Sequence, residues 1–324
     1  MNRRILLGLG RRRPVVVVFL RGGADGLNLV IPQFERLYYD RRPTLAIRDG
    51  VRIDDRFSLH PGLRPLAGIA SFVHAVGSDD STRSHFEAQD RMERGGGAGG
   101  WMARCVGRGP LSAVAIGPTP PESLRGAASV AFESAAEFRF HGDATKLARL
   151  YDGDDPLSRA GADTIETLRA VERISGEPGD GYAEIARLIR ADVGVEMAHL
   201  DVGGWDSHFA QAAWGSQIED LGGRLAWLHG EIGDRARIVV MTEFGRRAYE
   251  NVSLGTDHGR GGVMIVMGSG IAGGRVVTDW PGLEEDRLDD GDLRVTIDYR
   301  EILADVIDRE DVFPGVPLIR RLTA

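Results

Sequence analysis

The chain has 324 residues, of which 42% are hydrophobic and 27% charged, a balance typical of one large α/β domain or two small ones. The formal net charge of −8 gives no broad basic field, which argues against non-specific binding to nucleic acid. A single cysteine, Cys105, excludes both an intramolecular disulfide and a thiolate zinc cluster.

The first residues, "MNRRILLGLGRRRP", open like an export signal. Their apolar stretch, Ile5 to Leu9, is shorter than the ~7–15 residues of a signal core, and arginines follow it at once. We therefore interpret residues 1–13 as a basic tail and expect a cytoplasmic protein. No apolar run approaches the ~20 residues that a membrane span needs.

Short apolar runs along the chain predict the strands of one sheet. The first run, in "PVVVVFLRGGADG" over 14–26, is β-branched and ends in glycines, as is typical of a strand buried on both faces of a parallel sheet. Similar runs occur over 71–80, 111–118, 194–204, 237–245 and 262–270.

Helical patterns alternate with these runs, over 84–94, 157–174, 181–192, 208–233 and 298–310. The first pattern begins at Ser84, with Glu87 three residues on, as in a capping box. The alternation predicts an open, doubly wound, mostly parallel sheet between helices. Residues 119–193 show no core-type strand, so we interpret them as an inserted cap or helical side layer on a single domain with its core at 14–118 and 194–324.

Polar clusters follow four of the predicted strands, where ligands gather in such sheets. The clusters hold Asp25 in "RGGADGLN", Ser84 and His85 in "STRSHF", Asp206 and His208 in "GGWDSH", and Glu243, Asp257 and His258 in "MTEFGR" and "GTDHGRGG". Carboxylates and imidazoles without thiolates suit zinc, manganese or iron. The glycines before Trp205 would let the backbone of Asp206 and His208 approach a ligand.

Each cluster also has a structural interpretation. Asp25 between glycines could make a turn, Ser84 could simply cap a helix, and residues 257–258 could form a solvated loop. His60 and His74 flank apolar residues, so we interpret both as structural histidines.

Several of these motifs together resemble a known family. "FLRGGADGLN", "LHPGLRPL", "RSHFEAQD", "GGWDSH", "TEFGRR", "TDHGRGG" and "GGRVVTDWPGL" are similar to the bacterial domain-of-unknown-function family 1501, over about residues 14–316. That family is grouped with the alkaline phosphatase and sulfatase superfamily, so the resemblance implies an α/β/α sandwich around a mostly parallel sheet. Its members usually carry an export signal of twin-arginine type, which this chain has only in shortened form.

The resemblance also implies metal ligands. A first site, suited to zinc or manganese, would take its ligands from Asp206, His208 and His258, and Asp257 is a further candidate metal ligand. Asp25 and Glu243 resemble ligands of a second site, but Phe244 stands where the superfamily has a metal-binding histidine. That second site would hold magnesium or calcium, or be empty.

The same resemblance places a nucleophile at Ser84, or less well at Thr82, where a helix N-terminus favours an anion. Arg83 or Arg246 could clamp the oxygens of the anion, although surface solvation would equally explain both arginines. The leading hypothesis is a metal-dependent hydrolase of a small phosphate ester or similar anionic ester. "RSHF" lacks the cysteine that sulfatases convert to their aldehyde, which argues against ordinary sulfatase chemistry.

Two alternatives remain open. A catalytically degenerate relative that binds an anionic ligand or a partner protein is favoured by Phe244 and by the short Asp-x-His spacing. A nucleotide-dependent oxidoreductase is weaker, because "RGGADG" lacks the expected glycine fingerprint. Convergence of Asp206, His208 and His258 on one point would favour the hydrolase over the binding protein.

Overall fold

The computed structural model describes residues 13–107, 109–135, 142–174, 177 and 179–323. The predicted basic tail therefore lies outside the described residues, apart from Arg13. The helices are α1 (Gly26–Leu29), α2 (Arg36–Arg41), α3 (His85–Arg94), α4 (Ala144–Leu150), α5 (Pro156–Ile174), α6 (Gly181–Arg190), α7 (Gly215–Ile232) and α8 (Tyr299–Ile307). The strands are β1 (Val15–Leu20), β2 (Val30–Pro32), β3 (Val51–Arg52), β4 (Phe57–Leu59), β5 (Ala70–Gly77), β6 (Ala113–Ile116), β7 (Val130–Phe132), β8 (Met197–Val202), β9 (Arg237–Thr242), β10 (Gly262–Gly268), β11 (Arg275–Val277) and β12 (Ile297–Asp298).

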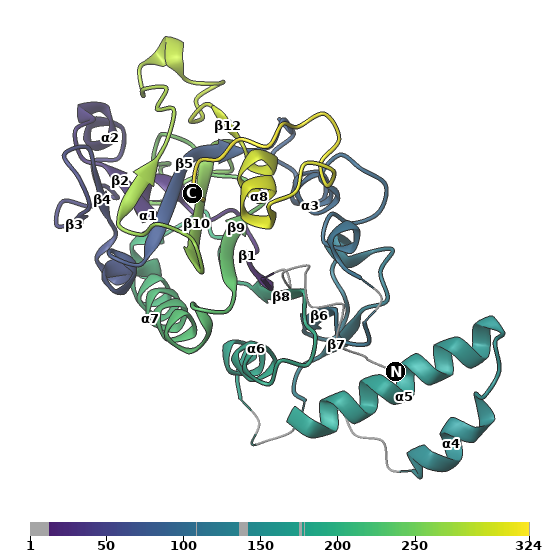
Figure 1. Cartoon of the computed structure of the whole chain (residues 1–324). Coiled ribbons are helices and arrows are strands. Elements are labelled where there is room, and N and C mark those ends of the chain that lie inside the picture. Colours follow the sequence, from purple (N-terminus) through teal and green to yellow (C-terminus); the bar gives the residue numbers. More distant parts are fainter. Residues whose placement is uncertain (1–12, 108, 136–141, 175–176, 178, 324) are drawn as a thin grey trace.

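A nine-stranded sheet forms the centre of the molecule (Figure 1). Its order is β11-β5-β10-β9-β1-β8-β6-β7, with β12 paired to β5. Every pair is parallel except those of β10, which runs antiparallel to both β5 and β9. The carboxyl ends of β1, β5, β8 and β9 therefore meet at one edge of the sheet, as the mostly parallel sheet predicted from the sequence requires.

Helices cover both faces of this sheet, which makes an α/β/α sandwich. On β1, Val16 and Val18 belong to the same buried cluster as Leu225 of α7. Val17, one step along the pleat, belongs instead to the cluster that contains Ile302 of α8. Alternate side chains of a strand point to opposite faces, so a continuous valine run is buried on both. Each such side chain stabilises the fold by about 1.5–3 kcal/mol.

Every predicted strand and helix is present, but the short helices α1, α2 and α4 and the short strands β11 and β12 were not predicted. The six predicted strands correspond to β1, β5, β6, β8, β9 and β10, and the five predicted helices to α3, α5, α6, α7 and α8. The expectation that residues 119–193 hold no strand of the sheet was wrong, because β7 pairs in parallel with β6. A second sheet of order β2-β4-β3 was also not predicted. The pair α4–α5 lies beyond the β7 edge, away from the body of the sheet (Figure 1).

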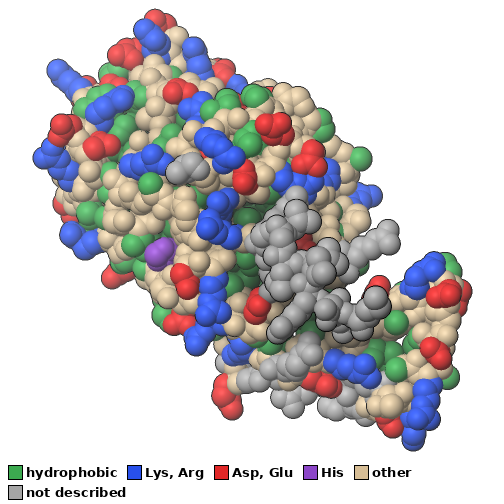
Figure 2. Space-filling model, viewed as in Figure 1, with side chains coloured by type: hydrophobic (Ala, Val, Ile, Leu, Met, Phe, Trp, Pro, Cys, Tyr) green, Lys and Arg blue, Asp and Glu red, His purple; other side chains and the backbone are tan. Residues whose placement is uncertain are grey.

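The surface carries both signs of charge. Figure 2 shows basic and acidic side chains interspersed over the face that it draws, as the modest net charge led us to expect. Within the described ranges, no helix combines the length and the apolar character needed to cross a bilayer.

Candidate metal centre

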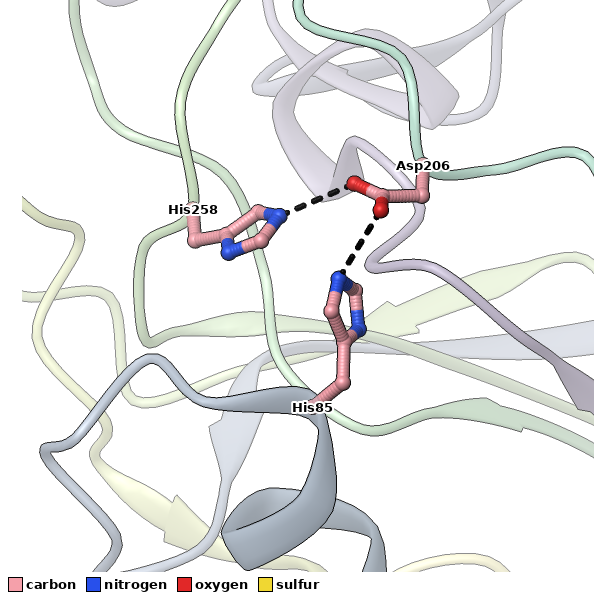
Figure 3. A group of neighbouring side chains, drawn as sticks. All are labelled: His85, Asp206 and His258. Atoms are coloured by element: carbon pink, nitrogen blue, oxygen red, sulfur yellow. Dashed lines mark hydrogen bonds and ion pairs between the residues drawn. The ribbon is translucent and has the colours of Figure 1, made fainter.

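Loops at the carboxyl edge of the sheet bring four polar side chains together. His85 is the first residue of α3, Asp206 and His208 follow β8, and His258 lies between β9 and β10. Figure 3 shows the imidazoles of His85 and His258 directed at the two carboxylate oxygens of Asp206. The ligand atoms of His85, Asp206 and His258 all lie within 4.8 Å of one another, so these three could hold a metal ion. His208 is not part of that group, but its Nε2 lies beside two of the members.

The distances within the group suit a small coordination shell. Asp206 Oδ1 lies 3.0 Å from His258 Nε2 and 3.2 Å from His208 Nε2, and the two Nε2 atoms are 3.0 Å apart. Asp206 Oδ2 lies 3.1 Å from His85 Nε2. Atoms bound tetrahedrally at 2.0–2.1 Å from zinc lie about 3.3 Å apart. The separations therefore resemble those of ligands around one ion.

The far nitrogen of each imidazole meets an acceptor. His85 Nδ1 lies 2.9 Å from Glu243 Oε1, His208 Nδ1 lies 2.9 Å from Asp257 Oδ1, and His258 Nδ1 lies 3.1 Å from the carbonyl oxygen of Arg83. A proton on each Nδ1 satisfies all three contacts. Metal-binding histidines are commonly held in this way, which fixes the tautomer and the ring orientation.

That tautomer leaves lone pairs on all three Nε2 atoms, each of which approaches the carboxylate of Asp206, and the Nε2 atoms of His208 and His258 also approach each other. Such a set of acceptors repels itself unless a cation lies between them. His85 Nε2 is buried and makes no hydrogen bond, despite its 3.1 Å approach to Asp206. An unpartnered buried nitrogen is costly, and coordination of an ion would remove the cost. The residues thus fit a divalent ion with imidazole and carboxylate ligands.

Burial and nearby charges favour the protonation states of Asp206 and His258 that can bind a metal ion. Burial raises the pKa of Asp206, but the hydrogen bond with His258 and the charges of His85, His258 and Arg246 outweigh it and lower the pKa to about 2. Burial lowers the pKa of His258 below its ordinary value, an effect that its bond to Asp206 opposes. At neutral pH the carboxylate is therefore ionised and His258 is neutral, as metal ligation requires.

Two glycines after β1 let the chain pass close to this centre. A Cβ atom on Gly22 would lie 2.2 Å from the backbone nitrogen of Asp206, and φ of Gly22 is +122°. A Cβ atom on Gly23 would lie 2.4 Å from the ring of Phe244. The glycines of "RGGADG" are thus needed for a close approach of chain segments.

The ring of Phe244 packs against two of the imidazoles. Its ring centroid lies 5.0 Å from that of His85 and 4.6 Å from that of His258, and its side chain is buried. The residue that departs from the superfamily pattern therefore packs against two candidate ligands.

The predicted second metal site is not assembled. Asp25 is buried and its Oδ2 accepts a 2.6 Å bond from the fully buried guanidinium of Arg42. Glu243 accepts hydrogen bonds from the backbone of Gly22 and Gly23 and from the side chain of Gln89. Among the described residues, neither Asp25 nor Glu243 belongs to a group of three side chains able to share an ion. An adjacent arginine opposes a cation at Asp25.

Both arginines that were predicted to bind the oxygens of an anion, Arg83 and Arg246, donate hydrogen bonds to other groups of the protein. The buried guanidinium of Arg246 donates to the carbonyl oxygens of Gly22, Gly23, Trp205 and Thr256 over 2.5–3.0 Å. The guanidinium of Arg83 donates to Asp290 and Asp292. Arg246 thereby ties the β1 loop to the segment that carries Asp206, whereas Arg83 pairs with two carboxylates.

Ser84 occupies the N-cap position of α3, but its side chain makes no capping hydrogen bond, so the predicted capping box does not form. The Ser84 hydroxyl therefore makes no hydrogen bond to the backbone of the helix. Ser84 is the residue directly before His85. The Thr82 hydroxyl donates to Asp80 and accepts from the Ser84 N–H. Of the two predicted nucleophiles, Ser84 has the less engaged hydroxyl.

His85 was not among the metal ligands predicted from the sequence. His85 belonged to the "STRSHF" cluster, but within that cluster the resemblance gave a role to Ser84, as the nucleophile, and none to His85. The available signal was its position one residue into a helix that follows a parallel strand, which places the imidazole at the same edge as Asp206.

Comparisons with known proteins bear on the family and the fold. A search of curated proteins found no match. A solved structure of a protein in the alkaline phosphatase superfamily from Vibrio parahaemolyticus aligns with 84% of this chain at 9% identity and a TM-score of 0.35. The alignment spans 64% of that protein, less than two thirds of its length. The PH0037 protein from Pyrococcus horikoshii aligns with 93% of this chain and 98% of its own, at 11% identity and a TM-score of 0.30.

A family model described as "Protein of unknown function (DUF1501)" matches residues 122–309, which is more than half of the chain. This match confirms the family predicted from the motifs. The matched region contains Asp206, His208 and His258, while His85 lies before it. The chain belongs to the DUF1501 family.

Proposed function

We propose that the protein is a metal-dependent hydrolase of a phosphate ester or a similar anionic ester. The observation that carries the proposal is the convergence of three Nε2 atoms on the carboxylate of Asp206, each imidazole being held at its far nitrogen. The ligands proposed for zinc or manganese are His85, Asp206, His208 and His258.

The ligand set also accounts for the expected charge of the substrate. A bound divalent ion supplies a Lewis acid that polarises the ester and stabilises negative oxygen. Without it, the carboxylates of Asp206, Glu243 and Asp257 would repel an anionic ester. Glu243 and Asp257 keep His85 and His208 in the tautomer whose Nε2 is free of a proton.

Ser84 is the proposed nucleophile. Its hydroxyl lies at the N-terminus of α3, a helix of ten residues, where the partial positive charge of the helix end favours an anionic oxygen. The hydroxyl does not cap the helix and adjoins the proposed ligand His85. We expect Ser84→Ala to abolish turnover while leaving metal content unchanged, and Thr82→Ala to keep both. Unchanged turnover in Ser84→Ala would exclude the serine mechanism.

The first experiment is elemental analysis of the purified protein beside a His208→Ala/His258→Ala variant. We expect near-stoichiometric zinc, manganese or iron in the wild type and its loss in the variant. The same samples are then assayed with 4-nitrophenyl phosphate and 4-nitrophenyl sulfate. Absence of bound metal from the wild type, even after loading with zinc and manganese, would contradict the hydrolase proposal.

A second candidate is a relative that binds an anionic ligand or a partner protein without catalysis. The observation that favours it is the engagement of Asp25 by Arg42, which leaves one candidate metal position where the superfamily resemblance implied two. A metal-containing protein that binds inorganic phosphate but hydrolyses neither ester would support this candidate.

A further inference from the structure

A buried ion pair joins two segments that carry candidate ligands. Arg83 lies two residues before His85, in the loop that leads into α3. Its Nε donates to Asp292 Oδ2 over 2.8 Å, and its Nη2 donates to Asp290 Oδ2 over 3.0 Å. The Asp292 side chain is fully buried, whereas that of Asp290 is 81% exposed. Asp292 is therefore the enclosed partner of Arg83, and a buried carboxylate is stable only when it is paired in this way.

The backbone around Asp292 is fixed to the segment that carries His258. Arg247 forms an antiparallel bridge with Asp292, and Arg246 forms one with His258. The Arg247 N–H also donates to the Asp257 carbonyl over 3.0 Å. Backbone contacts thus make one unit of three short segments that are distant in the sequence. Through its guanidinium, the loop before α3 is attached to this same unit.

Arg83 contacts His258 through its own carbonyl oxygen. His258 Nδ1 lies 3.1 Å from that oxygen, and a proton on Nδ1 makes the contact a hydrogen bond. The backbone of Arg83 is left-handed, with φ of +57°. A residue with a side chain rarely adopts this conformation, and it persists only where the surrounding structure holds it. The two bonds of the guanidinium to carboxylates provide such a hold, so they also fix where the carbonyl oxygen lies.

The ion pair also bears on how two imidazoles of the centre face each other. His85 follows Arg83 by two residues, and His258 belongs to the unit that contains Asp292. The ring centroids of His85 and His258 are 4.5 Å apart, and the ring planes are inclined by 78°. Figure 3 shows these two rings reaching Asp206 from different segments. Loss of the ion pair would free the loop before α3 from the segment of His258.

We propose that Arg83 and Asp292 are positioning residues of the candidate metal centre. Asp292 holds the guanidinium of Arg83, and the Arg83 carbonyl then fixes the tautomer and the ring orientation of His258. This role rests on the proposed metal centre, but it requires no hydrolysis of an ester. Arg83, which was predicted to bind the oxygens of an anion, here acts through its backbone on a metal ligand.

The test measures the affinity of the full chain for Zn²⁺ and Co²⁺ by competition with a chelator, and records the absorption spectrum of bound Co²⁺, which depends on ligand geometry. We expect Asp292→Asn to lower the affinity about tenfold and to change the spectrum. Arg83→Gln should do the same. The double variant should lose no more than the larger single loss, because both residues act through one contact. Arg83→Lys keeps a cation for Asp292 and should lose less than Arg83→Gln.

Two controls separate positioning from a general loss of stability. Asp305 is also fully buried, and its carboxylate accepts from the backbone of residues 321–323. Asp305→Asn should therefore lower stability in urea, as Asp292→Asn does, but it should leave metal affinity and the Co²⁺ spectrum unchanged. Asp290→Asn removes only the exposed partner of Arg83, so it should change metal affinity by about threefold or less.

Equal metal affinity in Asp292→Asn and wild type, or losses that add in the double variant, would overturn the positioning role. If Asp292→Asn does not fold, equal affinity in Arg83→Gln and wild type would overturn it as well. A wild type that binds no metal would contradict both this role and the hydrolase proposal. Metal binding that depends on Asp292, without hydrolysis of either nitrophenyl ester, would support the positioning role and contradict the hydrolase proposal alone.

Discussion

At the scale of single residues, the candidate centre is defined by which nitrogen of each histidine faces inward. His85, His208 and His258 all present Nε2 to Asp206, and Glu243, Asp257 and the Arg83 carbonyl hold the other nitrogen. A substitution can therefore remove a ligand, or remove only the group that orients it. These two kinds of change have different expected sizes.

Removing His85 tests a candidate ligand that was not predicted from the sequence. His85→Ala leaves Asp206, His208 and His258 in place, so a site made of those three alone would keep its metal. We expect metal affinity to fall by at least tenfold, a loss of about 1.4 kcal/mol or more. Competition with a chelator measures the affinity, and Phe86→Ala serves as the control because Phe86 is 87% exposed. Equal affinity in His85→Ala and wild type would remove His85 from the ligand set.

Removing an orienting group should have a smaller effect. Asp257→Asn replaces the acceptor of His208 Nδ1 with an amide that can present its nitrogen there. We expect metal affinity to fall about tenfold, within the range found when outer partners of metal-binding histidines are changed. Asp220→Asn, on the exposed face of α7, is the matched control. An unchanged affinity in Asp257→Asn would mean that His208 is not a ligand, or does not depend on this partner.

At the scale of elements, the site depends on a close approach of loops. Glycines in the loop after β1 make this approach possible because they have no Cβ atom. Gly22 and Gly23 follow β1, and the ends of β8 and β9 pass against them. Arg246 then joins these loops through four carbonyl oxygens. The position of Asp206 is thus set by backbone contacts between three loops.

Gly22→Ala should displace Asp206. The added Cβ would lie 2.2 Å from the Asp206 backbone nitrogen, at a φ of +122° that L residues rarely adopt. We expect a loss of about 1–3 kcal/mol in the free energy of unfolding, measured in urea, together with weaker metal binding. Gly203→Ala, where a Cβ meets nothing within 4 Å, should change neither quantity. Equal stability of the two variants would contradict the role given to Gly22.

The sequence predicts the large elements well because their burial leaves a clear pattern. β1 is valine-rich along its length and buried on both faces, and α6 has a regular apolar face. The strands β2, β3, β4 and β7 have two or three residues each, too few for a period of two to be visible. The helix predicted over 208–233 begins only at Gly215, the first residue of α7, because residues 211–214 form a separate 3₁₀ helix.

The sequence predicts the site less well, because partners come from distant positions. Four strand ends locate the edge where ligands gather, and Asp206, His208 and His258 do come together there. Nothing in the local pattern indicates that Asp25 pairs with Arg42, or that Arg246 is buried among carbonyl oxygens. Those contacts exist only after the sheet has assembled, and they change the chemistry open to each residue.

At the scale of the whole molecule, the acid stability of the fold should depend on a buried histidine that is not among the proposed metal ligands. His74 of β5 is fully buried and packs against the rings of Phe57 and Trp280, which also contact each other. Its Nδ1 accepts from the Ala75 N–H at 2.8 Å, and its Nε2 donates to the Val30 carbonyl at 2.9 Å. Only the neutral ring satisfies both bonds, which agrees with the prediction of a structural histidine.

Burial, with a contribution from nearby Arg42, lowers the pKa of His74 to about 3. The unfolded chain binds a proton there below about pH 6.5, whereas the folded chain does not, so the folded state loses stability as the pH falls from about 6.5 toward 3. Each proton of difference contributes about 1.4 kcal/mol per pH unit. Urea unfolding of the wild type and His74→Gln at pH 7, 6 and 5 measures the slope. We expect the His74→Gln slope to be shallower by about one proton, and that of His229→Gln, at a partly exposed position, to change less. Identical slopes for His74→Gln and wild type would mean that His74 becomes protonated without unfolding, which the two buried hydrogen bonds argue against.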